Sequence, residues 1–508
     1  MDKKLRWKLS ICILIALMLS LVARFAYLEM DPPPYEDYGT TWFDEGAYVH
    51  NARSQVLFGE WNLEGDLWKP MYISPTFNYI SLLSFKTLGV NTFSMRIIPA
   101  FLGILTIIIS SLLIMSRRFE EGALFFIIGS ISPMLVMFSR IAMTEYLLLF
   151  FISIIIALMI NNKSSSWLFI GFLAPFLFFS KMVTLFFIAA IPISLGLYYA
   201  MYRTEATLKK LKIFTIGGII SLGIWLLWLI PNFNQWITAN FGGYGSRLGL
   251  GITKTGAALL KAFQFSLINS VIIALSILYT IYIIKRIRKK ERIELIELFF
   301  IITLALFFFQ MLFVDYALNR FVLLVPLLVL ISAMFLARIQ DSSFQINTTT
   351  LILKKDHILF TILFLYIIFS LTQSSLYFAP LSQNYDDAHT VIRNSQEIGR
   401  YIANETKVYG RYATALSLEN KIQPYFSTYH MTFANTDKNM LPLFENKEIN
   451  YAIIKENIFD QKEIEHYKGI EKSTVYNYIK DNFEIIKVIK GKNTRTNSQD
   501  DIYIYKRK

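Results

Sequence analysis

The sequence predicts a polytopic α-helical membrane protein that ends in a small α/β domain. Of its 508 residues, 54% are hydrophobic, and apolar runs recur from residue 9 to about residue 377. A soluble globule of this size needs more polar surface than such a composition supplies. From residue 380 the sequence is mixed and charged, without a run long enough to cross a bilayer. We therefore expect a membrane domain over residues 1–378 and a soluble domain over residues 379–508.

Eleven stretches are predicted to span the membrane, because a helix needs about 20 residues to cross the hydrocarbon core. Another stretch, 72–90, is interrupted by Pro75, Asn78 and Lys86, and we expect it to lie in the membrane interface. An uncleaved first helix is favoured over a cleaved signal peptide, because no small-x-small site follows the first apolar run. The predicted spans are 9–28, 97–115, 122–138, 144–161, 166–180, 182–202, 211–231, 256–284, 295–315, 319–338 and 357–377.

Basic residues set the predicted orientation in the cell membrane. If the stretch 72–90 does not span, all basic clusters face one side, whereas a spanning 72–90 would place the first cluster opposite the others. The positive-inside rule favours the first arrangement, with a cytoplasmic N-terminus and with the loop 29–95 and the C-terminal domain on the extracytoplasmic side. Much of the net charge of +13 thus serves orientation, and no nucleic acid is expected as a partner. The clusters are Lys3/Lys4/Arg6/Lys8, Arg117/Arg118, Arg203/Lys209/Lys210/Lys212, Lys285/Arg286/Arg288/Lys289/Lys290/Arg292 and Arg338/Lys354/Lys355.

Two adjacent acids, Asp44 and Glu45, lie in the predicted outer loop within "GTTWFDEGAYVHNARS". A general base must be an ionised carboxylate held against the hydroxyl that it deprotonates, and adjacent acids can divide this task with positioning. Two solvated loop acids are the plain alternative. His50 follows closely in the sequence, although a lone histidine is more often structural or solvated.

Further charged residues lie at the same predicted outer boundary. Lys69 in "DLWKPMY" and Lys181 in "FSKM" either extend toward lipid head groups or stabilise a phosphate leaving group. Arg140 and Glu145 in "SRIAMTE" are either an ordinary helix-end pair or part of a substrate site. Arg320 in "VDYALNR" reaches this boundary as well.

No metal site is predicted. The five histidines are scattered without HExxH spacing, and a single cysteine provides neither paired thiolate ligands nor an intramolecular disulfide. The sequence predicts no cofactor and leaves the use of a divalent metal open.

Several ordered motifs in residues 1–340 resemble the GT-C glycosyltransferases, in particular the PMT-like family of protein O-mannosyltransferases and lipid A aminoarabinose transferases. The order of the motifs is more specific than any one of them. "WFDEGAYVHNA" is similar to the family's Asp-Glu pair and following tyrosine, and "WKPMYISPTFNYISLLSFKTLGVNTFSMRIIPAFLGIL" to its Lys-Pro segment, interfacial helix and arginine at the next span. The remaining motifs are "SRIAMTEYLLLFF", with Glu145 at a usual Asp position, "FFSKMVTLFFIAAIP" and "NRFVLLVPLLVLISA".

The resemblance implies an integral membrane glycosyltransferase that uses a sugar linked to a polyprenyl phosphate, dolichyl or undecaprenyl, at the extracytoplasmic face. It implies that Asp44, with Glu45 beside it, acts as base on an acceptor hydroxyl (or phosphate). That oxygen attacks the anomeric carbon with inversion, and the lipid phosphate leaves. The acceptor is expected to be a glycan, a lipid or a protein. The implied donor-phosphate residues are Lys69, Arg320 and Tyr48, and the implied substrate residues are Arg140, Glu145, Lys181 and His50.

Two departures from the family pattern limit the comparison. Ala47 stands where aminoarabinose transferases carry an arginine, so one phosphate contact is lost or supplied elsewhere. Trp68 replaces an acid linked to metal binding, which argues against a bound metal and against assuming lipid A as acceptor. Two other function classes stay open: a flippase or transporter of lipid-linked glycans, and a ligase of such glycans. A transporter is expected to place its charges at the bilayer midplane or in repeated halves. The role of the C-terminal domain, acceptor binding or packing, is also open.

Overall fold

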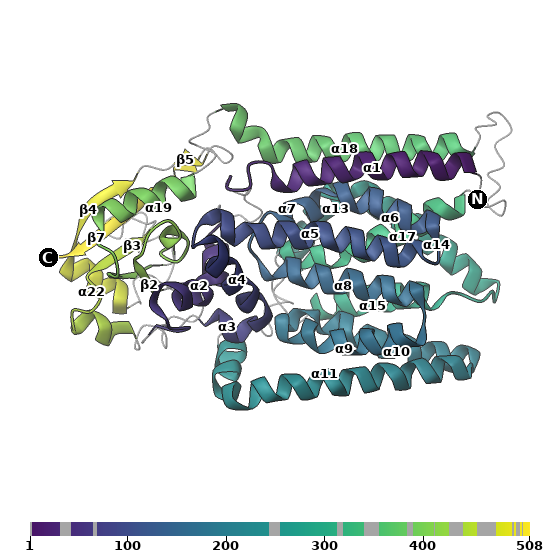
Figure 1. The fold of residues 1–508 in the computed structure, drawn as a ribbon, viewed down its shortest axis with the longest axis horizontal. Coiled ribbons are helices and arrows are strands. Elements are labelled where there is room, and N and C mark those ends of the chain that lie inside the picture. Colours follow the sequence, from purple (N-terminus) through teal and green to yellow (C-terminus); the bar gives the residue numbers. More distant parts are fainter. Residues whose placement is uncertain are drawn as a thin grey trace.

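The computed structural model consists of a helical bundle and a small domain at one end of it (Figure 1). Helices α1 and α18 lie along one side of the bundle and α11 along the opposite side. Three short helices, α2, α3 and α4, lie between the bundle and the C-terminal domain. The structure describes residues 3–30, 42–63, 69–242, 255–311, 318–339, 355–383, 390–410, 412–425, 440–454, 474–489, 492–493, 498–499 and 501–508.

The bundle follows the predicted spans closely. Seven described helices are long and apolar enough to cross a membrane, and three shorter apolar helices accompany them. The helices α6 and α7 form a further bent pair, with an angle of 60° between them. The number of spans remains a prediction. The bundle helices are α1 (Lys3–Phe25), α5 (Thr92–Met115), α6 (Phe119–Ile131), α7 (Pro133–Ser139), α8 (Thr144–Asn161), α9 (Ser164–Ser180), α10 (Leu185–Tyr202), α11 (Glu205–Ile237), α13 (Thr255–Ile268), α14 (Ser270–Arg288), α15 (Leu295–Met311), α17 (Val325–Ile339) and α18 (Lys355–Gln383).

Local chemistry explains where several of these helices begin and break. The bend between α6 and α7 falls at Pro133, which lacks a backbone N–H and begins a new helix as its first residue. A capping box starts α5, since the Asn91 side chain accepts from the Ser94 amide at 2.7 Å. The predicted span 256–284 is divided into α13 and α14 at Asn269, whose side-chain amide donates to the Phe265 carbonyl at 3.0 Å. Helix α18 continues to Gln383, beyond residue 378, where the membrane domain was predicted to end.

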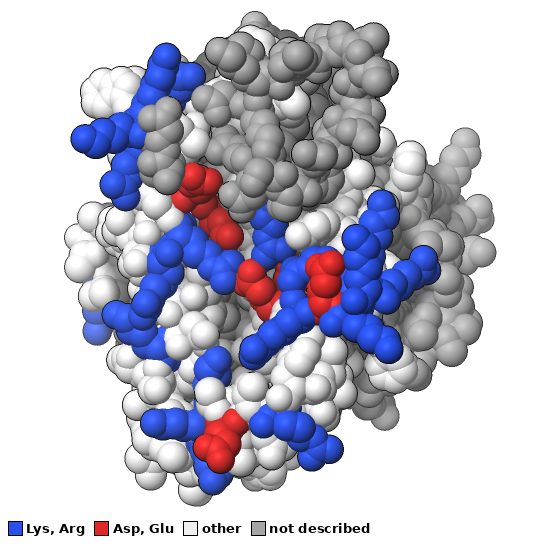
Figure 2. All heavy atoms as spheres, turned by 90° about the vertical axis from the view of Figure 1, so that its right-hand side faces the viewer, with Lys and Arg blue, Asp and Glu red and all other residues white. Residues whose placement is uncertain are grey.

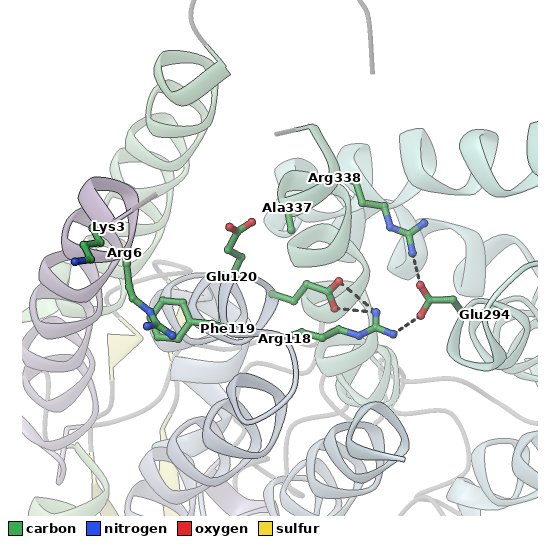
Figure 3. A pocket seen from close by; sticks show the side chains of 9 residues that line it. Lys3, Arg6, Arg118, Phe119, Glu120, Glu294, Ala337 and Arg338 are labelled. Atoms are coloured by element: carbon green, nitrogen blue, oxygen red, sulfur yellow. Dashed lines mark hydrogen bonds and ion pairs between the residues drawn. The ribbon is translucent and has the colours of Figure 1, made fainter. Parts of the chain in front are cut away.

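Lysines and arginines gather at the end of the bundle that faces away from the C-terminal domain (Figure 2). Buried and half-buried ion pairs connect the helix ends here: Arg118 to Glu294 at 2.6 Å, and Arg338 to Glu294 at 2.6 Å and Glu297 at 2.8 Å. Arg118, Glu294 and Arg338 line part of a polar pocket of about 560 Å³ (Figure 3). This end therefore has the basic character expected for the cytoplasmic side, and which side it faces in the cell stays a prediction.

The loop predicted to lie outside folds into α2 (Trp42–Phe58), α3 (Pro70–Ile73) and α4 (Pro75–Leu88). At 14 residues, α4 is by itself too short to cross the hydrocarbon core, and the interfacial placement expected for 72–90 stays a prediction. Helix α2 packs on both α3 and α4. Prolines at the first position of α3 and α4 set the two short helices apart from one another.

The C-terminal domain is a small α/β unit. Its five-stranded sheet has the order β2-β1-β3-β7-β4, with β1 parallel to both neighbours and β7 antiparallel to both neighbours. A two-residue pair of strands, β5 and β6, forms a second small sheet. The elements are α19 (Thr390–Tyr401), β1 (Lys407–Tyr409), the 3-10 helix η5 (Ala415–Ser417), β2 (Gln423–Tyr425), β3 (Tyr451–Ile454), α22 (Thr474–Asn482), β4 (Phe483–Ile489), β5 (Lys492–Asn493), β6 (Ser498–Gln499) and β7 (Ile502–Arg507).

Candidate functional site

Both candidate acids lie in the first turn of α2, at the end of the bundle covered by the C-terminal domain (Figure 1). A helix N-terminus carries a partial positive charge, which favours ionised carboxylates at this position. The two acids differ in environment, because Asp44 is half-buried whereas Glu45 is fully buried. The adjacent carboxylates are therefore suited to different tasks.

The Glu45 carboxylate accepts three hydrogen bonds. Arg96 of α5 donates from Nε to Oε1 at 2.9 Å and from Nη2 to Oε2 at 2.7 Å. The Ala142 amide, between α7 and α8, donates to the same Oε1 at 2.8 Å. Arg96 also donates to the carbonyls of Leu28 and Met30, just after α1. Glu45 and Arg96 thus connect α2 to α5, to the segment after α1 and to the segment before α8, and each oxygen of Glu45 accepts at least one hydrogen bond.

Tyr48, one turn after Asp44, lies against a second buried ion pair. The Lys181 ammonium, at the junction of α9 and the 3-10 helix η1 (Met182–Thr184), forms an ion pair with Glu145 in the first turn of α8. Lys181 also donates to the Tyr48 hydroxyl at 3.0 Å. Residues four apart on a helix share a face, so Asp44 lies on the side of α2 that meets this pair. The structure thereby brings together four of the sequence-predicted site residues.

The segment that begins at Lys69 contacts the same face of α2 through the start of α3. Lys69 directly precedes Pro70, the first residue of α3, and the Met71 amide donates to the Asn51 side chain at 2.8 Å. Asn51 is seven residues after Asp44, which places it two turns further along one face of α2. Lys69 is half-buried, and within the described part of the chain its ammonium forms no ion pair or hydrogen bond. No described residue therefore neutralises its charge.

The three remaining predicted residues are buried in other settings. Arg140, at the end of α7, donates to the carbonyls of Ala23 at 2.8 Å and Tyr27 at 2.7 Å, which satisfies backbone groups at the end of α1. Arg320 lies on α16 (Leu318–Phe321), which packs on α13. His50 is fully buried on α2. A substrate role for each of them remains a prediction, and the contacts of Arg140 favour a structural one.

No metal-binding cluster is found among the described residues: no three His, Cys, Asp or Glu side chains lie close enough together to hold an ion.

Sequence reasoning noted Arg96 as the arginine that opens a span in the family motif, but it did not pair Arg96 with Glu45, and it did not single out Asn51 or Arg53. Asn51 and Arg53 had no signal in the sequence, since their partners are backbone groups: the Met71 amide for Asn51, and carbonyls more than 360 positions away in the chain for Arg53. Such contacts leave no local pattern.

The arrangement combines an accessible carboxylate with nearby cations at the end of the bundle. Asp44 is the acid of the pair that retains exposure to a ligand, whereas Glu45 is enclosed. Lys181 is paired with Glu145, whereas Lys69 forms no ion pair with any of the described residues. A carboxylate beside a cation can accept a proton from one group while a neighbouring anion is stabilised.

The fold is similar to solved structures of GT-C glycosyltransferases. ArnT from Cupriavidus metallidurans bound to undecaprenyl phosphate matches with a TM-score of 0.61 and 11% identity, over 99% of this chain and 98% of that chain. Its apo state gives a TM-score of 0.61 and 12% identity, with the same coverage. The oligosaccharyltransferase AglB from Archaeoglobus fulgidus, in complex with an inhibitory peptide and a dolichol-phosphate, matches with a TM-score of 0.55 and 10% identity, over 98% of this chain and 74% of that chain.

No family model and no curated protein matches the sequence. The structural matches cover nearly the whole chain, membrane bundle and C-terminal domain together. The chain thus has the GT-C fold, as its sequence motifs predicted.

Proposed function

We propose that this protein is a membrane glycosyltransferase that moves a sugar from a polyprenyl phosphate to an acceptor hydroxyl at the extracytoplasmic face. The observation that carries the proposal is what gathers along one face of α2: half-buried Asp44, the Tyr48–Lys181–Glu145 contact, and the start of α3, directly preceded by Lys69, which forms no ion pair with a described residue. These groups lie at the end of the bundle opposite the basic face (Figure 1). That is the extracytoplasmic end if the positive-inside rule holds.

In the proposed reaction, Asp44 removes the proton from the acceptor hydroxyl. The acceptor oxygen attacks the anomeric carbon of the sugar, the bond from that carbon to the phosphate oxygen breaks, and the polyprenyl phosphate leaves with the electron pair. A single displacement inverts the anomeric configuration. Glu45 is unsuited to the role of base because Arg96 and the Ala142 amide hold its oxygens. Its role here is to orient the first turn of α2.

Lys69 is the proposed partner of the departing phosphate. Positive charge that is already in place when negative charge develops on a leaving group lowers the barrier. Tyr48 and Lys181 extend the polar surface next to it, with Glu145 fixing the Lys181 ammonium. Arg320 is assigned to the donor more loosely, since the packing described for α16 is on α13.

The structural neighbours support the class of donor. The ArnT structure holds undecaprenyl phosphate, and the AglB structure holds dolichol-phosphate. A chain that shares their fold over nearly its whole length is well suited to a polyprenyl phosphate. The likeness to AglB, an oligosaccharyltransferase, favours a ligase of lipid-linked glycans as the second candidate. A flippase is less well supported, because the charged residues described above gather at the ends of the bundle.

The test compares surface glycans by mass spectrometry in cells that carry the intact chain, Asp44→Asn or Glu60→Gln. Glu60 is an exposed acid just past the end of α2, so Glu60→Gln makes the same charge change outside the site. We expect Asp44→Asn to remove one sugar from one glycan and Glu60→Gln to leave the glycans intact. Loss of a whole oligosaccharide would favour the ligase. Unchanged glycans in Asp44→Asn cells would refute the proposal.

A further inference from the structure

A short segment of the C-terminal domain, residues 415–422, contacts the helix that carries the proposed base. We call this segment the clasp. It begins with η5 (Ala415–Ser417), which packs directly on α2. At the closest point Gly46 faces Ala415, so that a Cβ on Gly46 would lie 2.3 Å from the Ala415 Cα. The clasp therefore touches α2 within two residues of Asp44.

Arg53 fastens the clasp to α2 two turns further along. Gly46 and Arg53 are seven residues apart and so share one face of the helix. Arg53 donates to the Ser417 carbonyl from Nε at 3.2 Å and from Nη2 at 2.9 Å, and to the Asn420 and Ile422 carbonyls at 2.9 Å each. Burial lowers its pKa to about 9, so the guanidinium remains charged at neutral pH. Charged donors make stronger hydrogen bonds than neutral ones.

Glu419 fastens the same segment to α5. One of its oxygens accepts from the Thr92 amide at 2.8 Å and from the Thr92 hydroxyl at 2.7 Å. Thr92 is the first residue of α5, where a carboxylate satisfies an otherwise unpaired amide and the helix dipole. Arg96, which holds Glu45, lies one turn later on α5. The clasp thus contacts both helices that form the Glu45–Arg96 pair.

The clasp is anchored on both of its sides. Leu418 is buried in the apolar cluster that contains Tyr48, Val49 and Met95, so it fills the space between α2 and α5. On the domain side, the Asn420 side chain donates to the carbonyls of Ser395 and Leu416 at 2.8 Å each. These contacts connect the clasp to α19 and hence to the body of the C-terminal domain.

We propose that the clasp is a positioning element of the transfer site, with Arg53 and Glu419 as its positioning residues. It holds α2 and α5 against one another, so that Asp44 stays aligned with the bound sugar. The proposal deepens the proposed function and rests on it. Loosening the clasp should slow transfer more than it weakens donor binding, because the described contacts of the clasp are to α2 and α5, whereas Lys69 directly precedes α3 and Lys181 directly follows α9. A domain that only packs on the bundle would show no such separation.

The experiment uses the full-length protein in detergent and two matched pairs of variants. Glu419→Gln is paired with Glu448→Gln, which removes an exposed acid of the same domain that pairs with Lys407. Arg53→Lys is paired with Arg507→Lys, because Arg507 also donates to backbone carbonyls but lies within the C-terminal domain. Hydrogen exchange of peptides covering α2 reports its mobility, and undecaprenyl phosphate serves as the binding probe. Sugar transfer is measured as glycan occupancy in cells.

In Glu419→Gln and Arg53→Lys we expect α2 exchange to become roughly tenfold faster, as for the loss of a hydrogen bond to a charged group. Transfer should fall by a similar factor, while undecaprenyl phosphate binding changes less than about twofold. The two control variants should leave all three measurements unchanged. If Glu419→Gln does not fold, Thr92→Val tests the same contact from the α5 side.

The proposal is overturned if α2 exchange does not respond, if the control variants have the same effect, or if α2 loosens while transfer stays normal. It is also overturned if donor binding falls as far as transfer does. Failure of the proposed function would look different: Asp44→Asn would leave glycans unchanged, while α2 exchange would still respond to Glu419→Gln and so support the mechanical link.

Discussion

Glu45 and Arg96 form a bidentate ion pair in which both side chains are fully buried. The Ala142 amide completes the coordination of Glu45, and the Leu28 and Met30 carbonyls complete that of Arg96. A buried charge is tolerated only when partners replace the water that it has lost. The pair therefore fixes the start of α2 and leaves the neighbouring acid, Asp44, as the one that can meet a ligand.

Glu45→Gln should destabilise the protein strongly, whereas Asp44→Asn should not. Removing one partner of a buried ion pair leaves an uncompensated charge and costs about 3–5 kcal/mol. Asp44 is half-buried, so loss of its charge should change stability by less than about 1 kcal/mol. Thermal unfolding of the purified variants checks both values. Equal destabilisation by the two substitutions would contradict the separate roles of the acids.

The Lys181–Glu145 pair allows a double-mutant cycle. Lys181→Met and Glu145→Gln each leave the other buried charge without its main partner, and each should cost about 3–5 kcal/mol. The double variant should recover much of the loss in stability, since no buried charge of the pair remains. Transfer activity should stay low in the double variant, because Tyr48 has then lost the Lys181 donor. Additive losses in unfolding free energy would show that the two side chains do not interact.

Lys69→Met should weaken binding of the donor phosphate without affecting the fold. A hydrogen-bonded charge is worth about tenfold to hundredfold in affinity, and half-buried Lys69 has no described ion-pair partner whose loss would matter for stability. Lys86→Met is the matched control, because Lys86 is an exposed lysine on the neighbouring helix α4. Native mass spectrometry with undecaprenyl phosphate measures both. If both variants bound undecaprenyl phosphate equally well, a cation other than Lys69 would have to bind the donor phosphate.

The membrane part of this fold was largely predictable from sequence, because bilayer thickness and backbone hydrogen bonding demand long apolar helices. The sequence also indicated that 72–90 differs from the spans, and the structure forms the short helix α4 (Pro75–Leu88) there; its interfacial placement stays a prediction. The break of the predicted span 256–284 at Asn269 was missed, because a single polar residue in an apolar run is a weak signal.

The candidate site was only partly predictable, for a physical reason. Asp44, Tyr48 and Lys69 lie in short motifs that the sequence displays. The residues that organise the site come from distant positions in the chain. Lys181 donates to Tyr48, and Arg53 donates to the Asn420 carbonyl. Any residue can supply a backbone carbonyl, so such a partnership has no compositional trace. The role of the C-terminal domain could not be inferred for the same reason.

Close packing of α9 on α11 yields a last prediction. A Cβ on Gly171 of α9 would lie 2.0 Å from the Phe214 carbonyl oxygen, and one on Gly217 of α11 would lie 2.1 Å from the Leu168 carbonyl oxygen. Membrane helices associate through such small residues, because no hydrophobic effect drives apolar helices together in lipid. Gly171→Leu should thus force the two backbones apart.

We expect Gly171→Leu to cost about 1–3 kcal/mol or more, the usual cost of overpacking a close contact. Gly223→Ala is the control, since Gly223 is also on α11 and a Cβ there would meet nothing within 4 Å. That substitution should be neutral or slightly stabilising, because alanine favours helix more than glycine does. Thermal unfolding in detergent compares the two. Since Lys181 follows α9 directly, Gly171→Leu should also lower transfer, and a stable, fully active variant would show that α9 and α11 do not need this contact.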